Sequence, residues 1–226
     1  MAPTFITFEG LDGSGKSTHL RAVAAELARR DVAHVITHEP GGTPMADALR
    51  AVFLDPRWGQ VDGRVELLMV FASRRQHLLE RVDPALEAGQ VVLCDRFTDS
   101  TYAYQGHGRG VPLDLIDQVD EFATDRRRPD RTLLFDLPAE EARLRGHSPV
   151  RQRDGDADRL DAEDLAFYRR VRQGFLALAD AEPGRFRRID SSGPREATAR
   201  QVRAALADLW DFDPADDTGD DTGGDP

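Results

Sequence analysis

A glycine-rich segment between a predicted strand and a predicted helix constrains this chain more than any other feature. Gly10-Leu-Asp-Gly-Ser-Gly-Lys-Ser17 matches G-x-x-x-x-G-K-[ST], the phosphate-binding P-loop pattern. The β-rich run Thr4–Phe8 precedes it, and apolar residues at helical spacing follow it from Thr18 to Arg30. This order aims a helix N-terminus at an anion, so we predict that the segment binds the phosphates of ATP. The predicted ATP-binding residues are Gly10, Leu11, Asp12, Gly13, Ser14, Gly15, Lys16, Ser17 and Thr18.

Lys16 is the only lysine in the chain, although Lys and Arg together number 30. In a P-loop the lysine ammonium reaches the β- and γ-phosphates, and the hydroxyl of the next residue, here Ser17, is placed to bind Mg²⁺. A guanidinium is larger and differently shaped, so it cannot replace this compact charge. A chemical requirement at this position explains why one lysine remains among arginines.

Short apolar runs alternate with helical patterns along the chain. The runs predict buried strands at Thr4–Phe8, His34–Thr37, Val91–Cys94, Thr132–Phe135 and Phe186–Ile189. Helices are predicted near Thr18–Arg30, Gly63–Val82, Leu113–Thr124, Ala162–Ala179 and Arg195–Leu209. The alternation predicts an α/β fold with a five-stranded parallel sheet covered by helices on both faces. Ligands of such a fold gather beyond the carboxyl ends of the strands.

Net charge and composition limit the partners. The net charge is −11, which argues against nucleic-acid binding, and no apolar run is long enough to span a membrane. The single cysteine fits a reducing compartment, so we expect a soluble, cytoplasmic protein. Residues 1–210 are predicted to form one domain, and residues 211–226, with seven aspartates, an acidic disordered tail. The arginine bias fits either a GC-rich genome or salt adaptation, and the latter predicts activity in molar KCl.

One polar, arginine-bearing segment interrupts the alternation. It lies within about residues 145–160, between two predicted helices. It is predicted either to connect the helices as an exposed loop or to act as a small lid over ATP. A lid is favoured because a kinase must exclude water from the reaction.

The class of P-loop protein follows from two further observations. A GTPase of the Ras type reads guanine with Asn-Lys-x-Asp, and this chain has no second lysine to build that motif. After the strand Val91–Cys94 come Asp95 and Arg96 in succession, whereas a motor ATPase usually has a lone acidic residue there. The added arginine indicates that a second phosphate is held, which favours a kinase.

The chain resembles the thymidylate kinase family of bacterial or archaeal type. The resemblance rests on Phe8–Thr18, Glu39-Pro-Gly-Gly-Thr43, Asp95-Arg-Phe97, Asp99–Gly110 and Arg128-Pro-Asp130, and it extends over about residues 4–209. It implies a P-loop nucleoside-monophosphate-kinase fold and Mg²⁺-dependent transfer of the ATP γ-phosphoryl group to dTMP. It also implies a homodimer. The alternatives are a kinase for UMP or CMP and a P-loop switch without turnover.

The resemblance assigns roles in catalysis and acceptor binding. Asp12 resembles the carboxylate near the sugar 3′-hydroxyl, and Arg96 resembles the arginine that holds the acceptor phosphate, for which a bidentate fork is suited. Asp95 is expected to orient Arg96 or to hold a Mg²⁺-bound water. A tyrosine against the sugar, here Tyr104, would favour deoxynucleotides. The residues expected at the acceptor are Glu39, Phe71, Arg74, Arg75, Arg96, Ser100, Thr101, Tyr104 and Gln105.

Three features of the sequence depart from the family pattern or leave a choice open. One of Arg74 and Arg75 is expected to contact a thymine carbonyl, because neighbours on a helix lie about 100° apart. Aligning on Arg74 puts Val70 where the family has a stacking phenylalanine, so we expect Phe71 to be the stacking ring. His38 replaces a family arginine and is expected either to hold phosphate when protonated or to be structural.

Charge at the transferring phosphoryl group is expected to come from the lid, because the P-loop has no arginine in this chain. In one subgroup of the family the lid supplies this arginine. Arg151 and Arg153 are the first candidates for a catalytic role, and Arg145 and Arg159 follow.

Overall fold

The computed structural model describes residues 2–146 and 158–210. Five parallel strands form one sheet in the order β2-β3-β1-β4-β5. The strands are β1 (Thr4–Gly10), β2 (His34–His38), β3 (Val91–Asp95), β4 (Arg131–Asp136) and β5 (Phe186–Asp190). All five coincide with the predicted apolar runs, and the α/β class is confirmed. β1 is buried along its whole length, as expected for the central strand of a sheet covered on both faces.

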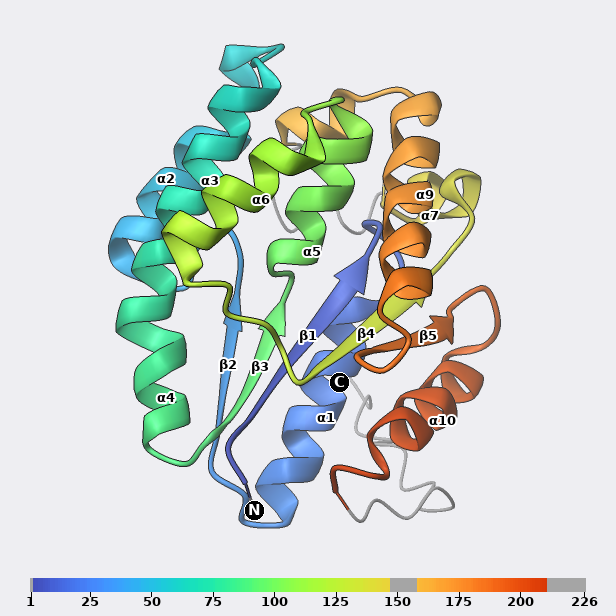
Figure 1. The fold of residues 1–226 in the computed structure, drawn as a ribbon. Helices are drawn as coiled ribbons and strands as arrows, with labels where there is room; N and C mark the ends of the chain where they lie inside the picture. Colours follow the sequence, from blue (N-terminus) through green and yellow to red (C-terminus); the bar gives the residue numbers. More distant parts are fainter. Residues whose placement is uncertain (1, 147–157, 211–226) are drawn as a thin grey trace, which may run out of the picture.

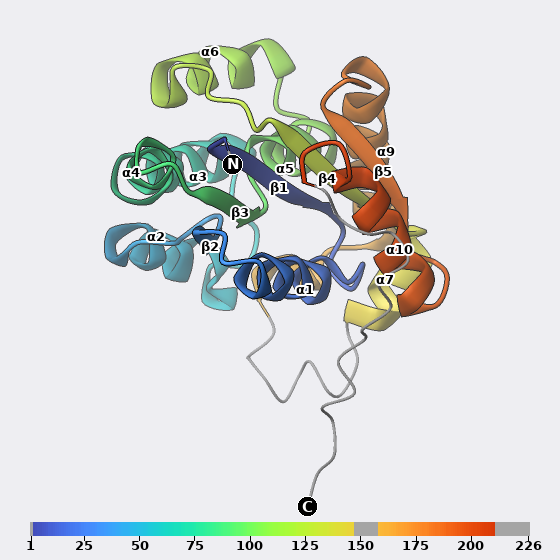
Figure 2. The same ribbon diagram turned by 90° about the horizontal axis from the view of Figure 1, so that it is seen from below.

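Helices cover both faces of the sheet (Figures 1 and 2). On one face, α1 (Lys16–Arg29) and α10 (Arg195–Leu206) bury Leu20, Leu27 and Leu206 in one cluster with side chains of β1 and β4. Burying such a side chain contributes roughly 1.5–3 kcal/mol. On the other face lie α3 (Gly63–His77), α5 (Thr98–Thr101) and α9 (Leu165–Ala181). The site therefore rests on a rigid, two-sided core.

Several elements differ from the predictions. The single helix predicted over Gly63–Val82 is α3 followed by a π-helical segment, η2 (Leu78–Val82), and then α4 (Asp83–Glu87). Four further elements were not predicted: α2 (Pro44–Leu54), α5, the π-helical η3 (Tyr102–Gly108) and α7 (Ala139–Gly146). The remaining elements are α6 (Leu113–Thr124) and two short 3₁₀ turns, η1 (Pro56–Trp58) and η4 (Arg159–Ala162). None of the helices described in residues 2–146 and 158–210 is both long and apolar enough for a membrane span.

The strand order places two chain segments side by side at the carboxyl edge of the sheet. From β1 the chain first builds β2 and β3 on one side and later β4 and β5 on the other. Phe8 in β1 pairs with Asp95 in β3, so the segments that leave these two strands start next to each other. This reversal of direction is where open α/β sheets bind ligands.

Candidate active site

The phosphate loop joins β1 to α1, and its shape requires glycine. Gly10 has φ 133°, and a Cβ there would overlap the carbonyl oxygen of Phe135. Gly13 has φ 82°, and a Cβ there would lie 2.6 Å from the carbonyl oxygen of Ala142. Only glycine combines such backbone angles with such close packing. The glycines of the pattern therefore serve the fold of the loop.

Lys16 is enclosed by this loop, with only 5% of its surface exposed. Its Nζ donates to the carbonyl oxygen of Leu11 at 2.9 Å and lies 3.8 Å from Oδ1 of Asp12. Burial lowers the pKa of Lys16 to about 8, and the nearby Arg96 adds to the effect. An ammonium whose charge is disfavoured in this way gains strongly from a bound anion such as a phosphate.

Ser17 and Asp95 together offer oxygen ligands for a metal. The Ser17 hydroxyl donates to Oδ2 of Asp95 at 2.6 Å. A hydroxyl beside a carboxylate fits Mg²⁺, which prefers oxygen ligands and keeps several waters and substrate phosphates. Within residues 2–146 and 158–210, no group of three His, Cys, Asp or Glu side chains forms a dedicated cage. The chain therefore fits a Mg²⁺ that is held mainly by the nucleotide.

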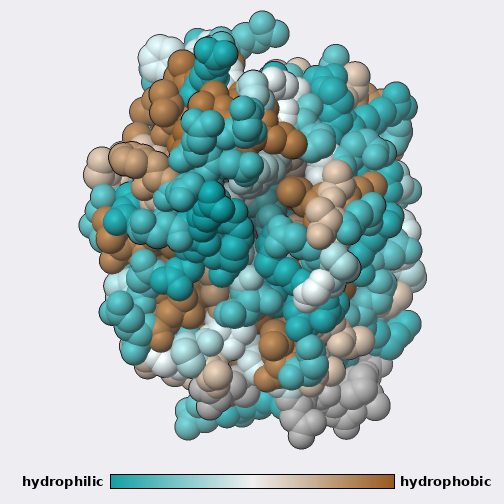
Figure 3. Space-filling view, viewed as in Figure 1, coloured by the Kyte–Doolittle hydropathy of each residue, from teal (hydrophilic) through white to brown (hydrophobic). Residues whose placement is uncertain are grey.

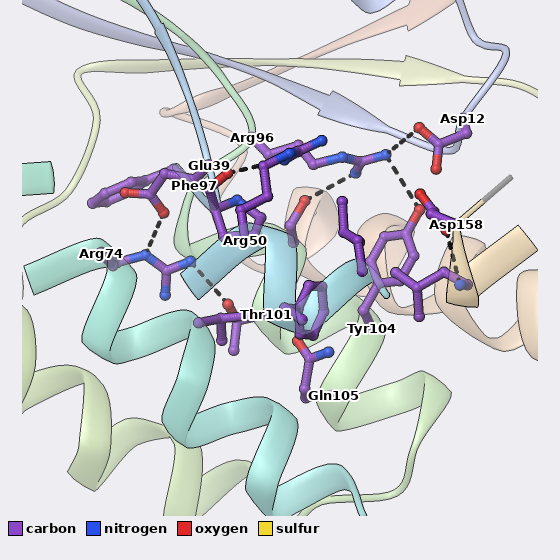
Figure 4. A pocket seen from close by; sticks show the side chains of 16 residues that line it. Asp12, Glu39, Arg50, Arg74, Arg96, Phe97, Thr101, Tyr104, Gln105 and Asp158 are labelled. Carbon is purple, nitrogen blue, oxygen red and sulfur yellow. Dashed lines mark hydrogen bonds and ion pairs between the residues drawn. The ribbon is translucent and has the colours of Figure 1, made fainter. Parts of the chain in front are cut away.

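A cavity opens beside the phosphate loop (Figure 4). It encloses about 630 Å³ of empty space, including its open mouth, which is within the size range of small-molecule sites. Side chains from α2, α3, α5 and η3 form its walls. Eight of the predicted site residues line it: Asp12, Glu39, Arg74, Arg96, Ser100, Thr101, Tyr104 and Gln105.

Arg96 lies between the phosphate loop and the cavity. Its Nη2 donates to Oδ1 of Asp12 at 2.9 Å and to the Tyr104 hydroxyl at 3.3 Å, and its Nη1 donates to Ser100 Oγ at 3.0 Å. The backbone of Arg96 has φ 72°, a conformation that costs a non-glycine residue of order 1–3 kcal/mol. Such strain at a ligand site indicates that the guanidinium position matters for function.

Arg50, on α2, places a second guanidinium on the cavity wall. Its Nη1 donates to the carbonyl oxygen of Pro40 at 2.9 Å. Burial lowers the pKa of Arg50, and the positive charge of Arg96 adds to the effect. Two guanidinium groups on the wall of one cavity make a strong site for a dianionic phosphate.

Arg74 is held at the other side of the cavity, in α3. Its Nε donates to Oε2 of Glu39 at 2.6 Å and its Nη2 donates to Thr101 Oγ1 at 2.9 Å. The Arg74 guanidinium also lies 4.7 Å from the ring centre of Phe71 and 5.1 Å from that of Phe97. Among the described residues no hydrogen-bond partner is present for its buried Nη1. This N–H group is therefore an unsatisfied donor on a side chain that lines the cavity.

Glu39 orients Arg74 and is itself oriented. Its Oε1 lies 2.8 Å from Nδ1 of His77, whose Nε2 lies 2.6 Å from Thr37 Oγ1. Although burial acts in the opposite direction, Arg74 and His77 together lower the pKa of Glu39. Glu39 is thus an ionised support of Arg74 on the cavity wall.

The geometry distinguishes between the members of two neighbouring pairs on α3. Arg75 is not brought to the cavity: its Nη1 lies 3.4 Å from the carbonyl oxygen of Ala123 and 3.2 Å from Asp125 Oδ2. One residue along a helix turns the side chain by about 100°, so Arg74 and Arg75 cannot share one target. Phe71 packs on Arg74 in the core, whereas Val70 lines the cavity at the position expected for a stacking ring.

The π-helical segment η3 presents Tyr104 and Gln105 to the cavity. Tyr104 packs edge-on against Phe167 and Phe175 of α9, with ring centres 6.1 and 6.2 Å apart, and burial raises the pKa of its hydroxyl. Single π-helical turns are frequent at functional sites. The hydroxyl of Ser100, one of the residues expected at the acceptor, lines the cavity and bridges Arg96 and Glu9.

The remaining predictions lie at the margin of the site or outside the described residues. His38 is 47% exposed, its Nε2 lies 3.9 Å from Asp47, and it does not line the cavity. Arg145 donates to the carbonyl oxygen of Ser191 at 2.9 Å. Arg159 is buried and donates to Oε1 of Glu66 at 2.6 Å, so it is turned into the core. Arg151 and Arg153 lie outside the described residues.

Sequence reasoning missed several residues of the site. Arg50 was missed because α2 was not predicted, although Thr43 followed by Pro44 is a helix-start signal. Glu9 lies in the matching segment Phe8–Thr18, but nothing in the sequence assigns it a role behind Ser100. Asp158 also lines the cavity. Burial and the carboxylates of Asp161 and Asp12 raise its pKa.

A parallel P-loop sheet with an acceptor cavity beside the phosphate loop defines a nucleoside-monophosphate kinase. The family model described as thymidylate kinase matches residues 8–202. The thymidylate kinase of Latilactobacillus sakei subsp. sakei (strain 23K) is 45% identical over 211 residues, covering 92% of this chain and 96% of that protein. The chain belongs to the thymidylate kinase family.

Two further comparisons agree. The thymidylate kinase of Geobacter sp. (strain M21) is 44% identical over 203 residues, covering 89% of this chain and 90% of that protein. The crystal structure of thymidylate kinase from Ehrlichia chaffeensis superposes with a TM-score of 0.70 at 33% identity, covering 90% of this chain and 99% of the other. The resemblance inferred from the motifs is therefore confirmed over most of the chain.

Proposed function

We propose that this chain transfers the γ-phosphoryl group of ATP to dTMP, giving dTDP and ADP. The observation that supports dTMP as the acceptor is the distribution of arginines around one cavity. Figure 4 shows Arg96 beside Asp12 at one side and Arg74 at the other. Arg96 and Arg50 suit the 5′-phosphate of the acceptor, and Arg74 suits a carbonyl oxygen of the base.

The residues of the phosphate loop bind and orient ATP. Backbone N–H groups of the loop and the Lys16 ammonium hold the phosphates, and Arg96 holds the acceptor phosphate in line for attack. Ser17 and Asp95 would hold Mg²⁺, which, when bound with ATP, neutralises charge on the phosphates. Catalysis thus depends on position and on electrostatic stabilisation, with little covalent chemistry supplied by the protein.

The sugar and the base meet the walls formed by α3 and η3. Tyr104 lines the cavity, and a tyrosine packed against the sugar would exclude a ribose 2′-hydroxyl and so favour deoxynucleotides. Val70 gives the base an aliphatic wall in place of an aromatic ring, so dispersion contacts replace stacking. Arg151 and Arg153 remain the predicted source of positive charge at the transferring group.

A homodimer and a cytoplasmic location remain predictions. In favour of a dimer, apolar side chains are exposed on α2 and α3: Met45, Val52, Val65 and Leu68. Figure 3 shows apolar atoms gathered on the upper left of one face, in the region of α2, α3 and α6. Light scattering should give about twice the chain mass of 25.1 kDa; a monomer across micromolar concentrations would contradict the dimer.

One experiment tests the proposed function. ADP release is followed with ATP, Mg²⁺ and, in turn, dTMP, dUMP, UMP, CMP and dGMP. We expect the highest kcat/KM with dTMP. A preference for UMP or CMP would replace dTMP by a ribonucleotide acceptor, and no ADP release with any of them would favour a nucleotide switch.

A further inference from the structure

Glu66 lies behind the cavity wall and connects three segments that are far apart in the chain. It is fully buried in the first turn of α3. Its Oε2 accepts from Nε2 of Gln105 at 2.9 Å, and its Oε1 accepts from Nε of Arg109 at 3.1 Å and from Nη1 of Arg159 at 2.6 Å. A buried carboxylate is costly unless it is paired and hydrogen-bonded, and these contacts meet both conditions. Glu66 does not itself line the cavity.

The contact with Glu66 decides how the Gln105 amide is turned. A carboxylate paired with two guanidinium groups offers only acceptor oxygens, so the NH₂ group of Gln105 must face it. Amide orientation is assigned from the hydrogen-bond network, and here the network permits one choice. The carbonyl oxygen of Gln105 is then directed away from Glu66, and Gln105 is one of the side chains that line the cavity (Figure 4). The wall thus presents an acceptor at this position.

An acceptor from Gln105 and a donor from Arg74, two side chains that line the same cavity, would distinguish the pyrimidine bases. The buried Nη1 of Arg74, with no hydrogen-bond partner in the described part of the chain, is a donor. Thymine and uracil carry a hydrogen at N3 beside the carbonyl at C4, which complements an acceptor and a donor. Cytosine has an acceptor at N3 and an amino group at C4, so both contacts would be mismatched, and unpaired buried polar groups are costly.

We propose that Glu66 is a positioning residue: by holding the Gln105 amide in one orientation, it makes the cavity selective for pyrimidine 5′-monophosphates that carry a hydrogen at N3. This inference rests on the proposed function, because it places the base of the acceptor against η3. Glu66 acts through Gln105 and does not touch the substrate.

The test compares dUMP with dCMP, because these acceptors differ only at the N3 and C4 positions. Glu66→Gln keeps the shape of the side chain but offers both a donor and an acceptor, so Gln105 can turn either way. We expect the ratio of kcat/KM for dUMP to that for dCMP to fall about tenfold, mostly through a higher KM for dUMP. An unchanged ratio in the folded variant would overturn the proposal.

Glu163→Gln is the matched control. Glu163 forms an ion pair with Nη1 of the same Arg109 at 2.6 Å, whereas the Gln105 amide donates to Glu66. The substitution removes one negative charge from the same arginine, so it reproduces the electrostatic change without freeing the amide. The dUMP to dCMP ratio should stay within about twofold of the unmodified protein; an equal fall in both variants would overturn the proposal.

A charge-balanced variant covers the case in which Glu66→Gln fails to fold. Glu66→Gln combined with Arg159→Met removes one charge of each sign from the buried cluster, and it frees Gln105 in the same way. The expected fall in the ratio is the same, and its absence would overturn the proposal. Turnover of dTMP by the unmodified protein is measured first, and no turnover would reject the proposed function. If dTMP is turned over but the dUMP to dCMP ratio of kcat/KM is unchanged in the variants, only the role of Glu66 is rejected.

Discussion

The phosphate loop and the acceptor cavity lie side by side at the carboxyl edge of the sheet, and they are built in opposite ways. The loop is one short stretch of chain whose shape depends on glycine backbones and whose interior holds one lysine. The cavity gathers side chains from segments far apart, and fully or nearly fully buried carboxylates support it: Glu9 holds Ser100, Glu39 holds Arg74 and Glu66 holds Gln105. Binding of the ATP phosphates therefore depends on one short, continuous segment of the chain. Acceptor binding depends on buried carboxyl groups behind the wall that contacts the ligand.

Lys16→Arg should have the largest effect, because the loop has room for a compact charge only. The guanidinium keeps the charge but cannot occupy the same enclosed position beside Leu11, so kcat should fall by roughly 100-fold or more. Steady-state ADP release with saturating ATP and dTMP measures this. A fall in kcat of less than about tenfold would show that the loop accommodates a guanidinium. The phosphate loop and the arginine-lined cavity would then not differ in the kind of charge they accept.

Arg50→Met tests the cavity side with a residue outside the family motifs quoted above. Removing one of two guanidinium groups for the acceptor phosphate should raise the KM for dTMP about tenfold or more while leaving the KM for ATP unchanged. Arg57→Met is the matched control, since Arg57 is exposed on η1, where it pairs with Asp55 and lies over the Trp58 ring, and it does not line the cavity. Equal effects of the two substitutions would show that Arg50 does not bind the acceptor.

Glu9→Gln tests whether the buried carboxylates affect stability. Burial, with the carboxylate of Asp99 adding to it, raises the pKa of Glu9 from 4.5 to about 8. The folded protein then keeps a proton that the unfolded chain loses between these values, so this stabilisation is full below about pH 4.5 and is lost as the pH rises to about 8. Glutamine cannot titrate, so the variant should lose less stability over this range, by an amount on the order of a few kcal/mol.

Denaturant unfolding of the protein and of Glu9→Gln between pH 5 and pH 8 measures this difference in the free energy of unfolding. Parallel pH profiles would mean that Glu9 has the same pKa in the folded and unfolded chains. In that case the cavity is supported by an ordinary ionised carboxylate.

His38→Gln should have the smallest effect. His38 is half exposed and lies outside the cavity lining, so the substitution should change the KM for dTMP by less than about twofold. The KM for dTMP is measured from pH 6 to 8 with both proteins. A rise in KM with pH that disappears in the variant would restore the alternative that protonated His38 holds phosphate.

The two regions also differ in how far sequence predicts them. The strands were predicted because parallel strands buried on both faces are continuous apolar runs. The phosphate loop was predicted because its residues are consecutive. By contrast, η3 contains Gly106 and Gly108, which have weak helix propensity. Its packing explains both: a Cβ at Gly106 would lie 2.6 Å from Leu113, and one at Gly108 would lie 2.7 Å from Phe167.

The choice between adjacent side chains in the cavity could not be made from sequence. Arg74 and Arg75 are chemically identical, and the partners that distinguish them, the buried carboxylate of Glu39 and the hydroxyl of Thr101, come from other segments. The choice between Val70 and Phe71 is also made by contacts within the fold. The Phe71 ring packs against the Arg74 guanidinium, and Val70 lines the cavity. Such choices depend on partners from other segments, which no local pattern contains.

The single lysine of this chain makes the phosphate loop chemically addressable. An acylating reagent that reacts with amines can label only one side chain, and the lowered pKa of Lys16 leaves part of it neutral and nucleophilic near neutral pH. Bound ATP would cover the amine and raise its pKa again, so the fraction of peptide acylated at Lys16 would report loop occupancy directly. Mass spectrometry of that one peptide would then yield a dissociation constant for ATP, or for any competitor, without following turnover.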